Sequence, residues 1–224
     1  MLQNRLRFTP HSIGALPSHQ SARAQKSPFY FIISVNCCWQ SILSTASHVL
    51  IEVSPWVSLQ RAQQFINKQR PDFALSVTSR TLYQHNIALP LAYAIRRRFG
   101  LNNVQEEDVA TCLQEATQNA IIHGNLGINA NYHDGRGLEY YYKLIQRILY
   151  KDPFYHRHVT ICAWQNSDVI TIAVTDQGKG FEPPAQETHQ QLEKPFGRGL
   201  NLISNLCRDM RISSSPSTIY MDFA

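Results

Sequence analysis

The run Val-Ile-Thr-Ile-Ala-Val-Thr at residues 169–175 leads without a break into Asp176-Gln-Gly178-Lys-Gly180. Apolar and β-branched residues in such a run predict a buried β-strand, and the acid and the two glycines end it. A carboxylate at the end of a buried strand can accept a hydrogen bond from an exocyclic amine. Glycines let a flat ring approach the backbone closely, because they carry no Cβ atom. These residues therefore predict a ligand-binding loop at one end of a sheet.

Hydrophobic spacing predicts the other elements of the chain. Patterns with a period of 3.6 indicate helices, and short β-rich runs flanked by turn residues indicate strands. Helices are predicted first along the chain and antiparallel strands follow, with one late helix between them. This order predicts the fold class α+β, a two-layer sandwich in which helices pack on a mixed, largely antiparallel sheet. The predicted helices cover 55–70, 90–99, 106–123, 138–149 and 200–210, and the predicted strands cover 73–77, 159–164, 169–175, 211–214 and 219–223.

The formal net charge of +5 does not indicate a nucleic-acid-binding protein. Residues 1–50 contain four of the 21 Lys and Arg residues and none of the 16 acids, so residues 51–224 carry a net charge of only +1. Direct binding to nucleic acid usually requires a clear basic excess in the folded domain. We therefore expect no direct nucleic-acid partner.

The first 50 residues are open to three interpretations. Residues 1–26 are polar, and residues 27–51 contain no Asp, Glu, Lys or Arg. The charge-free stretch resembles the apolar region of a signal peptide, but it also fits a strand or short helix packed on the domain, or an upstream extension. Ser34, Asn36 and Gln40 interrupt it before the ~20 apolar residues that a membrane span requires. We therefore expect no membrane span.

The five cysteines indicate a reducing compartment. They are odd in number, form no C-x-x-C pair, and show no Cys/His spacing typical of zinc sites. Most of them lie in apolar segments, where a buried free thiol is the usual state. We therefore expect a cytoplasmic protein whose thiols are buried rather than catalytic.

Two further segments carry polar groups in suggestive patterns. Glu115, Asn119 and His123 are four residues apart in the predicted helix 106–123 and form a polar stripe beside its apolar face. Such a stripe fits a binding site, or a surface row with mutual hydrogen bonds. Phe-Gly-Arg-Gly-Leu at 196–200 is a glycine-rich turn that opens a helix. It fits either a tight turn or a phosphate site made of free N–H groups.

In this order, Glu115-x-x-x-Asn119, Asp176-x-Gly178-x-Gly180 and Gly197-x-Gly199 resemble the N, G1 and G2 boxes of the GHKL family of ATPases and kinases. The family's ATP-binding domain is the Bergerat α/β sandwich, and the resemblance covers about residues 72–224. The stretch Glu-Ala-Thr-Gln-Asn-Ala-Ile-Ile-His-Gly-Asn at 115–125, with Gly-Arg-Gly-Leu, is most similar to bacterial anti-sigma-factor serine/threonine kinases.

This resemblance implies a role for each matching residue. Asn119 would offer its side-chain oxygen to Mg²⁺, and Glu115 would orient or deprotonate the attacking hydroxyl as the catalytic residue. Asp176 would bind the adenine amino group, and residues 182–196 would form the ATP lid. His123 matches a phosphate contact, and a helix-end histidine bonded to the following loop fits equally. The implied ATP-binding residues are Asn119, His123, Asp176, Gly178, Gly180, Phe181, Gly197, Arg198, Gly199, Leu200 and Thr218.

The chain departs from the family pattern in two places. Ser-Pro-Ser-Thr at 215–218 replaces the usual Gly-Thr, in which the threonine supports adenine and corresponds to Thr218. The span 128–158 is longer than in compact anti-sigma kinases and contains Tyr-Tyr-Tyr at 140–142. Its predicted helix is either a partner-binding helix or an additional core helix.

The implied function is a serine/threonine kinase of the anti-sigma-factor type that uses ATP and Mg²⁺. It would bind a sigma factor or similar client, phosphorylate a STAS-type antagonist or respond to a receiver-domain regulator, and form a homodimer. The alternatives are an ATP-dependent binding switch without kinase activity and a catalytic ATPase domain of the histidine-kinase type. The expected organisation is a flexible or poorly defined extension at 1–50, a helical lead-in at 51–71, and an ATP-binding domain at 72–224 with an insertion at about 128–158.

Overall fold

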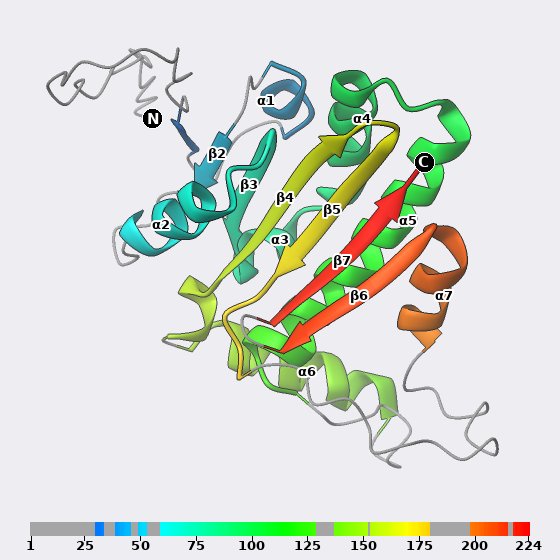
Figure 1. Ribbon diagram of the computed structural model, residues 1–224. Coiled ribbons are helices and arrows are strands. Elements are labelled where there is room, and N and C mark those ends of the chain that lie inside the picture. The colour runs from blue at the N-terminus through cyan, green and yellow to red at the C-terminus, as the bar shows by residue number, and fades with distance from the viewer. Residues whose placement is uncertain are drawn as a thin grey trace, which may run out of the picture.

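A seven-stranded sheet forms the centre of the molecule, in the order β1-β2-β3-β4-β5-β7-β6 (Figure 1). The computed structural model describes residues 30–33, 39–45, 49–52, 59–128, 137–151, 153–179, 198–214 and 217–224. The first three strands pair in parallel and every later pair is antiparallel. The strands are β1 (Tyr30–Ile33), β2 (Val49–Glu52), β3 (Phe73–Thr78), β4 (His158–Asn166), β5 (Val169–Thr175), β6 (Asp209–Ser214) and β7 (Ser217–Phe223).

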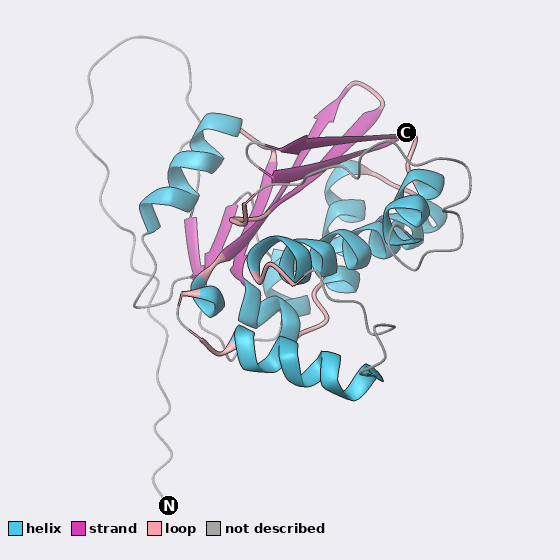
Figure 2. Cartoon of the chain, turned by 90° about the horizontal axis from the view of Figure 1, so that it is seen from below, coloured by secondary structure: helices cyan, strands magenta, loops and turns pink. Residues whose placement is uncertain are grey.

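Helices cover one face of this sheet, and α2 lies on the other face (Figure 2). The α-helices are α1 (Trp39–Thr45), α2 (Leu59–Gln69), α3 (Ser79–Gln84), α4 (Ala88–Phe99), α5 (Asn103–Asn119), α6 (Gly137–Leu149) and α7 (Arg198–Leu206). A π-helical turn, η1 (Ala120–Asn125), follows α5, and a 3-10 turn, η2 (Phe154–His156), precedes β4. No helix in the described part of the chain is long and apolar enough to cross a bilayer.

Strand alternation decides which residues form the core between the layers. Leu75, Ile161 and Ile172 are fully buried against the helical layer, on neighbouring strands of the sheet. Their strand neighbours point to the opposite face, where Ala74 and Cys162 pack against Ile66 of α2. The structure thus confirms the predicted two-layer sandwich of helices on a mixed, largely antiparallel sheet.

The sheet begins upstream of residue 72, where the ATP-binding domain was predicted to start. Strand β2 pairs in parallel with β3, and its last residue, Glu52, accepts hydrogen bonds from the backbone N–H of Thr78 (2.7 Å) and the hydroxyl of Thr81 (2.6 Å). The charge-free stretch therefore contains strands and a helix that pack on the domain. Residues 49–51 of this stretch are buried in β2, and buried parallel strands are typically continuous apolar runs. Residues 1–29 of the extension predicted at 1–50 lie outside the described residues.

Candidate functional site

Asp176 follows the last residue of β5 and lies at the centre of the site. Its Oδ1 accepts a hydrogen bond from the backbone N–H of Gly178 (2.7 Å), and its Oδ2 accepts one from the hydroxyl of Ser217 (2.7 Å). Burial raises the pKa of Asp176, and these two hydrogen bonds oppose that shift. Each carboxylate oxygen has a second lone pair. The group is therefore a fixed, partly buried acceptor that can bind a further donor.

Two glycines leave room for this carboxylate. A Cβ atom at position 124 would lie 2.3 Å from Cγ of Asp176, and one at position 178 would lie 2.3 Å from the carbonyl oxygen of Gly124. Neither distance is possible between non-bonded atoms, so both positions require glycine for steric reasons. Gly178 was predicted as a site residue, whereas Gly124 was expected only to end a helix. It instead forms one wall of the site beside Asp176.

Glu115 and Asn119 face the start of α7. A Cβ atom at position 199 would lie 2.6 Å from Oε2 of Glu115 and 3.6 Å from Nδ2 of Asn119. The first N–H groups of an α-helix have no partner within the helix and attract anions. The structure thus brings together the predicted Glu115, Asn119 and Gly199, and it places the first turn of α7 beside the two side chains of α5.

The sequence predicted a regular helix up to His123. The helix that carries these side chains is regular only as far as Asn119. It changes after Asn119 into the π-helical turn η1, a wide turn that is frequent at functional sites. Within η1, Nδ1 of His123 lies 2.8 Å from the carbonyl oxygen of Ile128. Burial lowers the pKa of His123, which favours the neutral ring with Nδ1 as the donor. This bond holds the loop after η1, as the structural alternative for His123 expected.

Asn125 connects η1 to the site, and no local pattern had marked it as a site residue. Its side chain is fully buried. Nδ2 donates to the hydroxyl of Ser79 (2.7 Å) and to the carbonyl of His158 (3.1 Å), and Oδ1 accepts from the N–H of Gln177 (2.7 Å). These partners belong to three segments that are distant in sequence. Asn125 therefore fixes the residue after Asp176 to the helical layer.

Ser217, and not Thr218, contacts the carboxylate of Asp176. The hydroxyl of Thr218 lies 2.9 Å from that of Thr175, its register partner on β5, and is buried there. Successive side chains of a strand point to opposite faces, so only one of two neighbouring hydroxyls can reach Asp176. That Thr218 supports adenine stays a prediction, and Ser217 is a further candidate to support a ligand at Asp176.

The remaining predicted residues divide into two groups. Arg198 is the first residue of α7, and Leu200 packs against the core in the first turn of the same helix. The other predicted residues lie outside the described part of the chain and stay predictions. They are Gly180, Phe181, the lid 182–196 and Gly197.

The described cysteines are not candidates for chemistry at this site. Cys112, Cys162 and Cys207 are free and buried. Burial raises the pKa of both Cys112 and Cys162 to about 12, so these thiols stay protonated at neutral pH and are poor nucleophiles. This agrees with the prediction of buried rather than catalytic thiols.

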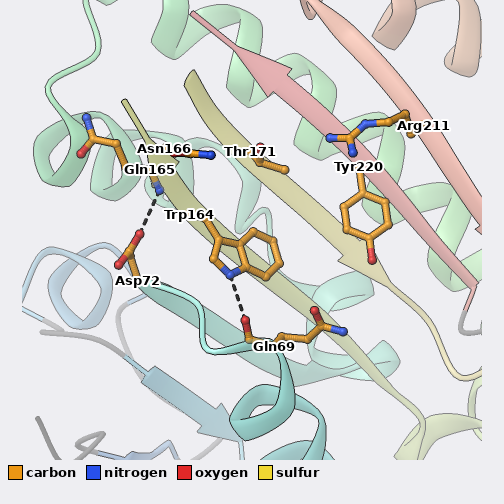
Figure 3. A pocket seen from close by; sticks show the side chains of 8 residues that line it. All are labelled: Gln69, Asp72, Trp164, Gln165, Asn166, Thr171, Arg211 and Tyr220. Carbon is orange, nitrogen blue, oxygen red and sulfur yellow. Dashed lines mark hydrogen bonds between the residues drawn. The ribbon is translucent and has the colours of Figure 1, made fainter. Parts of the chain in front are cut away.

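A hollow of about 480 Å³ lies away from Asp176, on the sheet face opposite α5, between α2 and the β4–β5–β7–β6 strands (Figure 3). Several polar groups at its edges are paired within the protein. The indole N–H of Trp164 donates to the carbonyl of Gln69 (3.1 Å), and the guanidinium of Arg211 donates to both carboxylate oxygens of Asp222. These groups stabilise the sheet face and offer little for recognition of a ligand.

Comparison with known families agrees with the geometry of the site at Asp176. A family model described as a histidine kinase-like ATPase domain matches residues 81–223. The chain belongs to this family. The matched span runs from α3 to β7 and includes Glu115, Asn119, Asp176 and Gly199. Membership of a family of ATPase domains supports ATP as the ligand of the site. A search of curated proteins found no match.

Proposed function

We propose that this histidine kinase-like ATPase domain is a serine/threonine kinase of the anti-sigma-factor type. It would bind Mg-ATP, transfer the γ-phosphoryl group to a STAS-type antagonist, and bind a sigma factor or similar client. The observation that carries the proposal is the carboxylate of Asp176, held between Gly124 and Gly178 where no Cβ atom fits. Glu115 and Asn119 lie in the same site against the start of α7.

Adenine recognition would depend on the free lone pairs of Asp176. The exocyclic amine of adenine would donate to this carboxylate, which Gly178 and Ser217 already orient. A hydrogen bond to a charged, partly buried acceptor contributes about 1.5–3 kcal/mol. The absence of side chains at Gly124 and Gly178 would let the flat base lie against the backbone. Asp176 would thus select adenine over bases that present a carbonyl at this position.

The phosphates would occupy the space between α5 and the start of α7. The free N–H groups at the start of α7 favour an anion there. Arg198, the first residue of α7, is positively charged and also favours an anion. The side-chain oxygen of Asn119 is a ligand of the type that Mg²⁺ prefers. A bound Mg²⁺ would neutralise charge on the transferring phosphoryl group.

Glu115 would act on the attacking hydroxyl. It lies one helical turn before Asn119 on α5 and faces Gly199, so its carboxylate is next to the proposed phosphate position. The acceptor serine or threonine oxygen would form a bond to the γ-phosphorus, the bond to ADP would break, and the hydroxyl proton would pass to Glu115. A switch that only binds ATP would need no base here, so the position of Glu115 favours the kinase.

The decisive experiment is phosphotransfer from γ-labelled ATP to purified STAS-type proteins encoded in the same genome. Glu115→Gln should reduce the rate at least 100-fold, because general-base catalysis contributes about 10²–10⁴-fold, and should leave the Kd for ATP nearly unchanged. Glu107→Gln is the matched control, since Glu107 is an exposed acid of the same helix. ATP binding without transfer to any such protein, or undiminished transfer by Glu115→Gln, would contradict the proposal.

A further inference from the structure

The insertion helix α6 is only half covered by the rest of the protein. Ile145 and Leu149, in its C-terminal half, are fully buried in the main core. Leu138 and Tyr142 belong to the same helical stripe, at spacings of four and three residues, yet they are 51% and 50% exposed. The apolar stripe therefore continues beyond the core into solvent. The C-terminal half of α6 is an additional core helix, and the N-terminal half has an uncovered face.

Side chains of α3, among them the aromatic Tyr83, join this face. Tyr150, one residue after α6 and 52% exposed, accepts a hydrogen bond from Nε2 of Gln84 (2.9 Å), and the guanidinium of Arg80 lies 5.1 Å from its ring centroid. Burial raises the pKa of Tyr83, and the nearby phenols of Tyr142 and Tyr150 raise it further, so the three rings are neighbours. We call the surface formed by Arg80, Tyr83, Gln84, Leu138, Tyr142 and Tyr150 the tyrosine patch.

The segments that carry the tyrosine patch have a basic excess. Residues 79–85 and 137–157 contain five Lys and Arg residues and two acids, a net charge of +3, while residues 51–224 together carry only +1. The rest of the folded chain is therefore net negative. Tyr and Arg are the residue types that most often dominate the binding energy of protein interfaces. A basic, tyrosine-rich surface fits a partner whose contacting surface is acidic.

The patch is next to the end of the sheet that carries Asp176. Strands β3 and β5 both run antiparallel to β4, so they end at the same edge. Helix α3 begins at Ser79, whose hydroxyl is bonded to Asn125, and Asn125 also holds Gln177 beside Asp176. Figure 1 shows α6 below this edge. A protein bound at the patch would therefore lie beside the proposed phosphotransfer site.

We infer that the tyrosine patch is the docking surface for the protein that receives the phosphoryl group, and that this protein has an acidic contacting surface. The inference rests on the proposed kinase function. A second copy of this chain is disfavoured, because a symmetric contact would bring the segments 79–85 and 137–157 of two copies, each with a net charge of +3, close to each other. Nucleic acid is disfavoured because the cations are partly engaged: Lys143 pairs with Glu139 (2.6 Å), and Arg157 donates to the carbonyl of Asn125 (2.6 Å).

The first test identifies the occupant of the patch in the source cells. The full chain carries a photo-cross-linking amino acid at position 142, or at position 104 as a control, since Val104 is 68% exposed on α5. We expect one acidic protein to cross-link at 142 and not at 104. Cross-linking at 142 to a second copy of the chain, to a basic protein or to nucleic acid would overturn the inference, and so would equal cross-linking at both positions.

The second test measures phosphotransfer to the cross-linked protein after purification. Tyr142→Ser with Tyr150→Ser should raise its KM at least tenfold, with kcat and the Kd for ATP nearly unchanged. Arg80→Glu with Lys151→Glu should do the same without removing a ring, whereas Arg208→Glu, an exposed control on the other side of α7, should have no effect. An unchanged KM in both double variants would overturn the inference. If the protein binds through the patch but receives no phosphate, the kinase proposal fails and the docking surface stands.

Discussion

Replacement of Asn125 by alanine tests whether one buried amide holds the site together. The change removes Oδ1 and Nδ2 and leaves the backbone of η1 in place. Three hydrogen bonds are lost, to Ser79, His158 and Gln177. Because Asn125 is 0% exposed, bulk water cannot replace its amide without local opening of the structure.

The expected cost follows from these three bonds. Each intramolecular hydrogen bond contributes about 1 kcal/mol net, and a buried group left without a partner costs about 1–3 kcal/mol. The variant should therefore lose about 3–4 kcal/mol of unfolding free energy, a large share of the stability of a typical domain. Since Gln177 is the residue after Asp176, its release should also loosen the carboxylate, and we expect the Kd for ATP to rise at least tenfold.

Denaturant unfolding and an ATP titration measure the two effects in the same samples. Asn205→Ala is the matched control, because Asn205 is exposed on α7 and its replacement should change stability by no more than about 0.5 kcal/mol. If the free energy of unfolding of Asn125→Ala is within about 0.5 kcal/mol of the wild-type value, the side chain of Asn125 does not hold η1 and the site together.

Three further changes test other parts of the structure. Burial lowers the pKa of His158 from 6.5 to about 4, so between these pH values the unfolded chain binds a proton that the folded protein does not. The free energy of unfolding should therefore fall by about 3 kcal/mol as the pH is lowered from 6.5 to 4. Denaturant unfolding of His158→Gln over this range should show a much smaller loss. Gly199→Ala should slow phosphotransfer at least tenfold with little change in melting temperature, because the new Cβ atom would lie 2.6 Å from Glu115 Oε2. Ser217→Ala removes a hydrogen bond that lowers the pKa of Asp176, so Asp176 of the variant should become protonated at a higher pH. When the solution is acidified, the variant should lose ATP affinity at a higher pH than the wild type does. An unchanged pH profile would exclude this role of Ser217.

Local patterns were sufficient to predict most of the sheet and the helices. The strand 169–175 matches β5 at both ends, and the turn at Ser167 and Asp168 joins it to β4, with Ser167 at a positive φ of 55°. These features depend on side-chain alternation and turn chemistry within a few residues, which one sequence contains. Helix α5 begins at Asn103, three residues before the predicted start at residue 106, and it has a capping box between Asn102 and Gln105.

Features that depend on distant contacts were not predictable in this way. Asn125 acts through partners 46, 33 and 52 residues away, so no local pattern marks it. The choice between Ser217 and Thr218 depends on the register of β7 against β5, and a shift of one residue exchanges the faces of the sheet. Strand β2 was missed because a short buried parallel strand has no alternation that separates it from other apolar segments.

Calorimetric titration of the full chain with ATP and ADP, with and without Mg²⁺, measures whether Asp176 binds the adenine of ATP. We expect saturable binding by the wild type and by Asp168→Asn, a change at an exposed acid in the β4–β5 turn. Asp176→Asn should weaken binding at least tenfold, because an amide cannot replace the charged acceptor without loss. Equal affinity of Asp176→Asn and the wild type, or no saturable binding by the wild type, would contradict this role of Asp176.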